Sequence, residues 1–232
     1  MFSYFGSKSK LIKHYPKPCT ALIIEPFAGS ARYALEYWYR DVILVDKDKN
    51  IIDVWRYLQA ASEKDIIGLP KLKAGMDLRE LNISEPERLF LGFMCGIGRA
   101  KPAHKVSPWA EIHFSEIGRR NKYEKIAEQL GKIRHWQFVH GDYACLANVL
   151  ATYFIDPPYQ VMGRTQYKHN AKDIDYHTLG AWAQSRRGQV IACENVGADW
   201  LPFQPMATLY GANAKSQEAL WTRAETGAGG VG

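Results

Sequence analysis

The chain has 232 residues, which is enough for one large domain or for a domain with an inserted lobe. Apolar residues make up 47% and charged residues 23% of it, a balance that is typical of globular proteins and excludes an intrinsically disordered chain. The 30 Lys and Arg residues exceed the 24 Asp and Glu residues by six, which weakly favours a polyanionic partner.

The sequence also indicates where the protein works. No apolar run approaches the ~20 residues that span a bilayer, and residues 1–4 do not resemble the start of a signal peptide. The cysteines form no CxxC pair and have no histidine at ligand spacing, so we expect reduced thiols and no metal site. They are Cys19, Cys95, Cys145 and Cys193. We therefore expect a cytoplasmic protein without a membrane span.

Short apolar runs alternate with helical patterns, which predicts an α/β fold with a parallel sheet and crossover helices. Residues 22–24 form the first expected strand, and a turn at 25–30 leads into a helix that we expect to run to Tyr39 with Ser30 as its N-cap. Strand 42–45 ends at Asp46 and precedes a helix over 51–58. The later expected elements are strands 137–139, 153–155 and 189–193 and a helix over 175–186.

Residues 60–135 interrupt this alternation and predict an inserted lobe. They contain four of the prolines, and the stretch 99–122 has six Lys and Arg residues against Glu111 and Glu116. We expect this lobe to carry a basic face. The remaining chain, 1–59 and 136–224, is expected to form the sheet domain, and the glycine-rich residues 225–232 a flexible tail.

The most informative motif is Asp156-Pro157-Pro158-Tyr159, directly after an expected buried strand. Two consecutive prolines restrict the backbone and remove two N–H donors. The motif would therefore present a carboxylate, a main-chain carbonyl and an aromatic ring at the edge of the sheet where ligands bind. This set suits an exocyclic amino group on a flat base, and the alternative is an ordinary proline-rich turn.

A second motif, Glu25-Pro26-Phe27-Ala28-Gly29-Ser30, forms a turn of small residues between a strand and a helix. Such a turn lets a nucleotide-like ligand approach the backbone, but it is neither a GxGxxG nor a P-loop sequence. Asp46, at the end of the next strand, is placed either to accept hydrogen bonds from ribose hydroxyls or to begin a helix.

Five motifs in this order resemble the DNA adenine methylase (Dam) family of N6-adenine methyltransferases, and the resemblance spans nearly the whole chain. They are Tyr4-Phe5-Gly6-Ser7-Lys8, the 25–30 turn, Asp46, Gly141-Asp142-Tyr143 and Asp156-Pro157-Pro158-Tyr159. The family implies a Rossmann-like methyltransferase sheet with helices on both faces and a largely helical target-recognition lobe at 60–135. It also implies S-adenosylmethionine as cofactor, double-stranded DNA as partner and no metal; the oligomeric state is left open.

The resemblance also assigns roles to residues. Those implied to bind the cofactor are Tyr4, Phe5, Gly6 and Lys8, which would close over it, Glu25, Phe27 and Gly29 at its amino-acid end, Asp46 at its ribose, Asp142 near its adenine, and Asp156. Catalysis would rest on Asp156, Pro157, Pro158 and Tyr159: the carboxylate and the Pro157 carbonyl would hold the target amino group while the ring stacks on a flipped-out base. Candidates for DNA contact are Arg99, Lys101, Lys105, Arg119 and Arg120 in the lobe and Arg164 and Lys168 in the 160–173 loop.

One departure from the family pattern and several alternatives accompany this interpretation. The family usually has a second glycine two residues after Gly29, whereas this chain has Ala31, whose methyl group could weaken cofactor binding. N4-cytosine methylation uses the same amino-group chemistry, and a non-catalytic DNA-binding protein could retain the fold. Glu194-Asn195-Val196 and Pro18-Cys19 resemble motifs of C5-cytosine methyltransferases, but here Pro18-Cys19 comes before the Glu25–Gly29 turn instead of after it.

Overall fold

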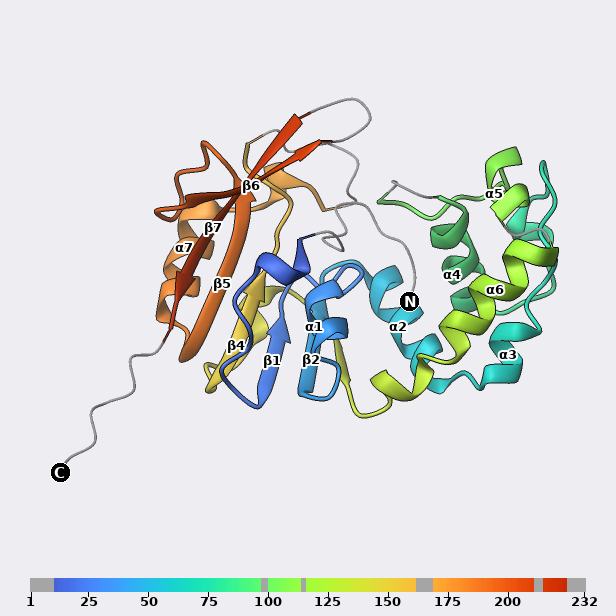
Figure 1. The fold of residues 1–232 in the computed structure, drawn as a ribbon, viewed down its shortest axis with the longest axis horizontal. Coiled ribbons are helices and arrows are strands. Elements are labelled where there is room, and N and C mark those ends of the chain that lie inside the picture. The colour runs from blue at the N-terminus through green and yellow to red at the C-terminus, as the bar shows by residue number, and fades with distance from the viewer. Residues whose placement is uncertain (1–10, 97–99, 114–115, 162–168, 211–214, 225–232) are drawn as a thin grey trace.

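The structure of the protein is a computed structural model that describes residues 11–96, 100–113, 116–161, 169–210 and 215–224 (Figure 1). Within these residues seven strands form one sheet in the order β3-β2-β1-β4-β5-β7-β6. Strands β1 to β5 are parallel, and β7 lies antiparallel to both β5 and β6. The strands are β1 (Leu22–Glu25), β2 (Asp41–Asp46), β3 (Gln137–His140), β4 (Ala151–Ile155), β5 (Gly188–Asn195), β6 (Gln204–Tyr210) and β7 (Lys215–Arg223).

Helices cover both faces of this sheet. The α-helices are α1 (Arg32–Glu36), α2 (Lys49–Ala60), α3 (Glu63–Ile67), α4 (Glu85–Cys95), α5 (Pro108–His113), α6 (Glu116–Ala127) and α7 (Tyr176–Ser185). Single 3-10 turns lie at η1 (Ile12–His14), η2 (Leu78–Glu80), η3 (Leu130–Ile133), η4 (Tyr143–Cys145) and η5 (Ala171–Asp173). None of the helices within the described ranges is long and apolar enough to cross a membrane.

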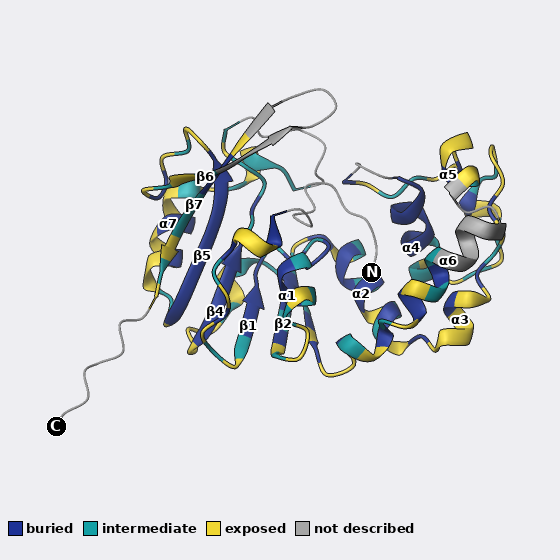
Figure 2. Ribbon diagram, viewed as in Figure 1, coloured by how far each residue is buried: buried dark blue, intermediate teal, exposed yellow. Residues whose placement is uncertain are grey.

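The side chains of the central strands alternate between two hydrophobic clusters, as the period of a strand requires. Phe154 of β4 packs on the face covered by α1 and α2, where its ring stacks on Tyr33 at 4.4 Å between centroids. Tyr153 and Ile155 pack on the other face against Leu179 of α7. Both β4 and β5 are buried along their whole length (Figure 2). The predicted parallel α/β sheet with helices on both faces is confirmed.

The predicted helix after β1 was wrong in its bounds and its cap. We expected a helix to Tyr39 with Ser30 as N-cap, but α1 spans only Arg32–Glu36 and its N-cap is Ala31. The backbone of Ala31 is left-handed (φ 45°), and the residue makes no side-chain cap. The acceptor comes instead from Glu25 on β1, whose Oε1 lies 2.6 Å from the backbone N of Ala34.

Between α2 and β3 the described chain is largely helical, and its core is continuous with that of the sheet. Figure 1 shows α3, α4, α5 and α6 grouped on the far side of α2 from the strands. Phe90 of α4 and Tyr123 of α6 belong to the same hydrophobic cluster as Trp55 of α2 and Phe154 of β4. The position of this lobe therefore depends on α2, which packs on both.

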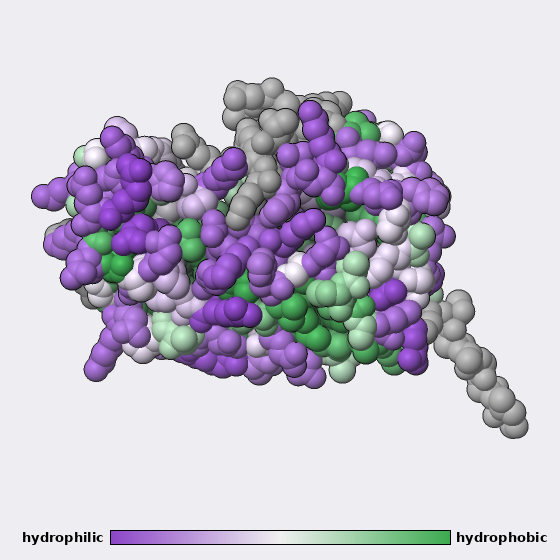
Figure 3. All heavy atoms as spheres, turned by 180° about the vertical axis from the view of Figure 1, so that it is seen from behind, coloured by the Kyte–Doolittle hydropathy of each residue, from purple (hydrophilic) through white to green (hydrophobic). Residues whose placement is uncertain are grey.

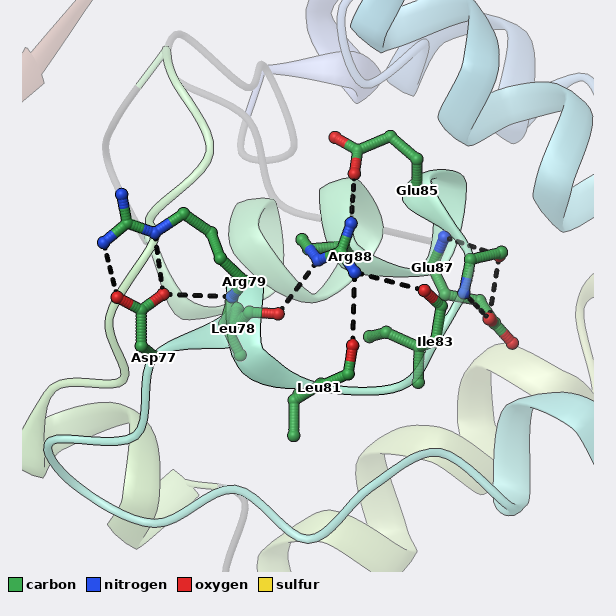
Figure 4. Close-up of polar contacts among 9 residues, drawn as sticks. Asp77, Leu78, Arg79, Leu81, Ile83, Glu85, Glu87 and Arg88 are labelled. Carbon is green, nitrogen blue, oxygen red and sulfur yellow. Dashed lines mark hydrogen bonds and ion pairs between the residues drawn. The ribbon is translucent and has the colours of Figure 1, made fainter.

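Polar contacts hold the turn before α4 (Figure 4). The Arg88 guanidinium donates to the carbonyl oxygens of Leu78 at 2.9 Å and of Leu81 and Ile83 at 3.2 Å, and it pairs with Glu85. Arg79 pairs with Asp77 through two contacts of 2.9 and 2.5 Å. Both arginines form ion pairs and hydrogen bonds within the lobe. Because their charges are paired with Asp77 and Glu85, they add little to the positive charge expected on residues 99–122.

Two features of the sheet were not expected from the sequence. Strands β6 and β7 form an antiparallel hairpin, and β7 inserts between β5 and β6. The chain between β3 and β4 contains only the short η4, so Leu22, Ile43 and Leu146 stay partly exposed on the α7 face. Seen from behind, apolar surface gathers below the middle of the molecule (Figure 3).

The packing of α7 generates the first prediction. A Cβ at Gly180 would lie 2.5 Å from the carbonyl oxygen of Trp200, whereas a Cβ at Gly131 of η3 would meet nothing within 4 Å. We expect Gly180→Ala to lower the free energy of unfolding by ~1–3 kcal/mol because α7 must move away from the Trp200 backbone, which lies between β5 and β6. Urea denaturation measures this, and Gly131→Ala is the matched control that should keep full stability. Equal stability of the two variants would contradict the close packing of α7.

Candidate functional site

The predicted site residues gather at one edge of the sheet. Glu25 and Asp46 end β1 and β2, Asp156 directly follows β4, and Asp142 lies two residues after the end of β3. Because these four strands are parallel, their carboxyl ends meet at the same edge. The strand order changes direction between β1 and β4, and a sheet of this kind binds ligands outside such a switch point.

The turn after β1 is held tightly against the end of β2. Gly29 has a left-handed backbone (φ 45°), which glycine adopts without strain. Its N–H donates to Asp46 Oδ2 at 3.0 Å, and its carbonyl accepts from the Trp55 indole at 2.9 Å. Ala31 is left-handed as well and is buried, so the methyl group that departs from the family pattern points into the protein core.

Asp46 acts as the link between two turns. Its second oxygen, Oδ1, accepts the Asp48 N–H at 2.8 Å, while Asp48 itself caps α2 by accepting the Asn50 N–H at 3.1 Å. Burial raises the pKa of the Asp46 carboxyl to about 6, against the lowering effect of the Gly29 and Asp48 N–H donors. Helix capping is therefore the role of Asp48, and Asp46 keeps further lone pairs for a ligand.

Two aromatic rings from different loops meet beside Asp142. The rings of Phe27, after β1, and Tyr143, after β3, have centroids 5.8 Å apart. The Asp142 carboxylate accepts the Ala144 N–H at 3.1 Å and pairs with the Lys47 ammonium at 3.4 Å. The loops after β1, β2 and β3 thus form one wall with aromatic faces and a carboxylate.

Contacts from three other elements hold the segment that begins at Asp156. The Tyr176 hydroxyl of α7 donates to the Pro158 carbonyl at 2.5 Å, and the Tyr159 hydroxyl donates to Glu218 Oε2 of β7 at 2.6 Å. The next N–H, that of Gln160, donates to Glu194 Oε1 of β5 at 2.5 Å. In the part of the chain that the structure describes, no donor reaches the Pro157 carbonyl, which the family resemblance implies as an acceptor for the target amino group.

Buried carboxyl groups surround Asp156. Burial, with a smaller contribution from the nearby Asp156 carboxylate, raises the pKa of Glu25 to about 8 and that of Glu194 to about 7. Burial and Asp156 also raise the pKa of the Tyr159 hydroxyl well above its usual value, so this hydroxyl stays a donor at neutral pH. The edge of the sheet therefore favours a cationic ligand or an amino group that donates hydrogen bonds.

Sequence analysis missed Glu194, Glu218 and Tyr176. Glu194 is fully buried and also accepts the N–H groups of Asn195 at 2.8 Å and of the Trp200 indole at 3.3 Å. In the sequence it is marked by the Glu194-Asn195-Val196 motif, which resembles a motif of C5-cytosine methyltransferases. No local pattern marks Glu218, because its strand was not predicted.

Other predicted residues are only partly placed. Lys101 and Lys105 are exposed in the lobe, and Arg119 and Arg120 lie on α6. Among the described residues no group of three His, Cys, Asp or Glu side chains could hold a metal ion. The predicted residues that lie outside the described ranges are Tyr4, Phe5, Gly6, Lys8, Arg99, Arg164 and Lys168.

Comparisons with known proteins add little to this geometry. No protein-family model matches the chain, and no curated protein matches it in sequence. A Streptococcus pyogenes structure titled "conserved hypothetical protein" is 13% identical with a TM-score of 0.32, covering 86% of this chain and 84% of that one. An Escherichia coli structure titled "Putative methyltransferase yhhF" is 8% identical with a TM-score of 0.38, covering 92% and 80%. Similarity at this level says nothing of activity or substrate.

The strand order itself defines the fold. Five parallel strands in the order 3-2-1-4-5, with helices on both faces, form a doubly wound sheet. The β6–β7 hairpin extends it at the β5 edge, with β7 as the antiparallel strand. The chain has the Rossmann-like sheet with helices on both faces that was expected for it.

The Glu25 carboxyl generates a prediction on stability. Its pKa is about 8 in the folded protein against 4.5 for a free side chain, so the folded state binds the proton more tightly than the unfolded state. The free energy of unfolding should therefore fall as pH rises, with Glu25 contributing a loss of roughly 4 kcal/mol between about pH 5 and pH 8.

Urea denaturation at several pH values measures this loss. Glu25→Gln keeps an acceptor for the Ala34 N–H and should flatten the decline, while Glu36→Gln, at an exposed residue of α1, is the matched control. Asp46 and Glu194 also have raised pKa values, so a smaller decline of the same sign remains in both variants. An unchanged slope in Glu25→Gln would contradict the assignment.

Proposed function

We propose that this chain is an S-adenosylmethionine-dependent methyltransferase that acts on the exocyclic amino group of adenine in DNA. The observation that carries the proposal is the placement of Asp156-Pro157-Pro158-Tyr159 at the switch point of the sheet. There a carboxylate, a carbonyl that accepts no hydrogen bond from a described residue and a half-buried aromatic ring follow β4 directly, next to the turn after β1.

The residues around the turn fit this cofactor. The left-handed turn at Gly29 brings main-chain atoms to the sheet edge, and the free lone pairs of Asp46 can accept hydrogen bonds from ribose hydroxyls. Phe27 and Tyr143 offer ring faces to an adenine. The Asp156 carboxylate favours the positive charges of the methionine end, and binding of such a charge would lower the raised pKa of the nearby Glu25 carboxyl. When bound, S-adenosylmethionine supplies an electrophilic methyl group on its sulfonium.

Asp156 and Pro157 would prepare the amino nitrogen for attack. Its lone pair is delocalised into the purine ring, and hydrogen bonds from its two N–H groups to the Asp156 carboxylate and the Pro157 carbonyl favour a pyramidal nitrogen. The Asp156 carboxylate can also take the proton that the nitrogen loses after methylation. Catalysis would then rest on positioning and electrostatics, without a covalent bond to the protein.

Tyr159 would hold the base. An amino group inside a stacked duplex is out of reach, so the adenine must be flipped out, and an aromatic face recovers roughly 1–3 kcal/mol of the lost stacking. Tyr176 occupies the Pro158 carbonyl, which leaves the neighbouring Pro157 carbonyl as the acceptor for the amino group.

The lobe between α2 and β3 would contact the DNA. Lys101 and Lys105 are exposed there, although the nearby Asp77 carboxylate partly offsets the charge of Lys105. Arg99, Arg119, Arg120, Arg164 and Lys168 remain candidates for phosphate or base contacts.

Methyl transfer tests the proposal directly. The wild-type protein, incubated with unmethylated DNA and S-adenosylmethionine, should produce N6-methyladenine at a defined sequence, and sequencing of the product maps it. Asp156→Asn should lower the rate at least ~100-fold, comparable to the loss of one key electrostatic group, while stability is kept. Asp41→Asn, at an exposed residue on the amino end of β2, is the matched control and should be fully active. If the product is N4-methylcytosine, the target base is cytosine and not adenine. DNA binding without methyl transfer would indicate a non-catalytic protein.

Salt dependence tests the role of the lobe. Lys101→Ala and Lys105→Ala should each lower the slope of log affinity against log salt concentration by about one unit if the side chain contacts a phosphate. Lys132→Ala removes the same charge in η3, before the amino end of β3, and should leave the slope unchanged. Equal slopes in all three variants would contradict DNA contact by these two lysines.

A further inference from the structure

We propose that Glu218 of β7 is a positioning residue for Tyr159, so that the β6–β7 hairpin is part of the active site. The inference rests on the proposed function, because it concerns the ring that would stack on the target base. Glu218 lies 59 residues beyond Tyr159 in the chain, and the two side chains meet through a 2.6 Å hydrogen bond from the phenol to the carboxylate.

The position of Glu218 is well defined by the sheet. It is only 3% exposed, and its backbone lies between Asn195 of β5 and Ala207 of β6. The β6–β7 register shifts between Pro205 and Ala207, which is the bulge or irregularity that faces Glu218 and its neighbour Ala219. Bulges often re-aim a side chain beside an active site. The pairing of β7 with β5 on one side and β6 on the other therefore fixes the backbone position from which the Glu218 carboxylate reaches Tyr159.

The chemistry of the pair makes this bond strong and directional. The raised pKa of Tyr159 keeps its hydroxyl protonated, and a phenol that donates to a carboxylate forms a charge-assisted hydrogen bond. The ring itself is only half-buried and packs against the edge of the hydrophobic core. Core packing fixes the ring on one side, and the hydroxyl bond further restricts its rotation about the side-chain bonds.

This arrangement changes what stacking alone would predict for Tyr159. If a ring face were the sole requirement, Tyr159→Phe would keep nearly full activity. With Glu218 as the positioning residue, Tyr159→Phe keeps the ring but removes its anchor and leaves the buried carboxylate without this donor. We expect it to lower kcat by ~10-fold or more, with the Kd for S-adenosylmethionine unchanged.

A double-mutant cycle tests the inference. Glu218→Gln keeps an oxygen acceptor and should stay within ~3-fold of the wild-type kcat, whereas Glu218→Leu should lose as much as Tyr159→Phe. The double variant Tyr159→Phe with Glu218→Leu should be no slower than either single variant. Gln217→Leu, at the neighbouring exposed residue of β7, controls for substitution in the strand.

A second measurement guards against misfolded variants. DNA with the fluorescent base 2-aminopurine at the target position should show brighter emission, because of weaker stacking, in Tyr159→Phe and Glu218→Leu than in the wild type or Glu218→Gln. A wild-type protein that transfers no methyl group overturns the proposed function together with this inference. An active wild type whose Tyr159→Phe and Glu218→Leu losses are additive, or whose Tyr159→Phe variant keeps full kcat, overturns the positioning role alone.

Discussion

The segment from Asp156 to Gln160 cannot hold itself in place, and much of the site depends on how other elements hold it. Two of its residues are prolines, which supply no N–H donors to a turn or a strand. Three long-range hydrogen bonds replace them: Tyr176 to the Pro158 carbonyl, Tyr159 to Glu218, and the Gln160 N–H to Glu194. Their partners come from α7, β7 and β5, so the segment has its shape only when these elements are packed together.

The same partners set the electrostatics of the edge. Glu25 and Glu194 are buried beside Asp156, and each serves a structural bond, to Ala34 and to Gln160. A buried carboxyl that accepts backbone N–H groups holds a turn in place, yet burial keeps its pKa high. Burial of Glu25 and Glu194 therefore makes the free energy of unfolding fall as pH rises. The same burial places two further carboxyl groups near Asp156. Such an edge suits a cation and an amino group side by side.

The turn after β1 shows how one residue can serve both packing and binding. Asp46 holds Gly29 with one oxygen and Asp48 with the other, and this joins the ends of β1 and β2. Ala31 adopts a left-handed backbone in the same turn, with its methyl group in the core. The left-handed backbone favours glycine and the buried position allows only a small side chain, so alanine is the mildest replacement for the glycine of the family that the sequence resembles.

The sequence by itself determined the parallel strands, their order of appearance and the motifs at their ends, because these follow from short apolar runs and from residues adjacent in the chain. Asp46 and Asp156 were placed at strand ends in this way, whereas Asp142 followed from the family resemblance. Local pattern failed at Ser30, since the acceptor for α1 comes from Glu25 on the preceding strand, and it failed at the β6–β7 hairpin.

Only the tertiary structure decided that Glu194, Glu218 and Tyr176 hold the Asp156 segment. Their partners lie 34, 59 and 18 residues away, and the insertion of β7 beside β5, which no periodicity in the chain encodes, brings Glu218 to Tyr159.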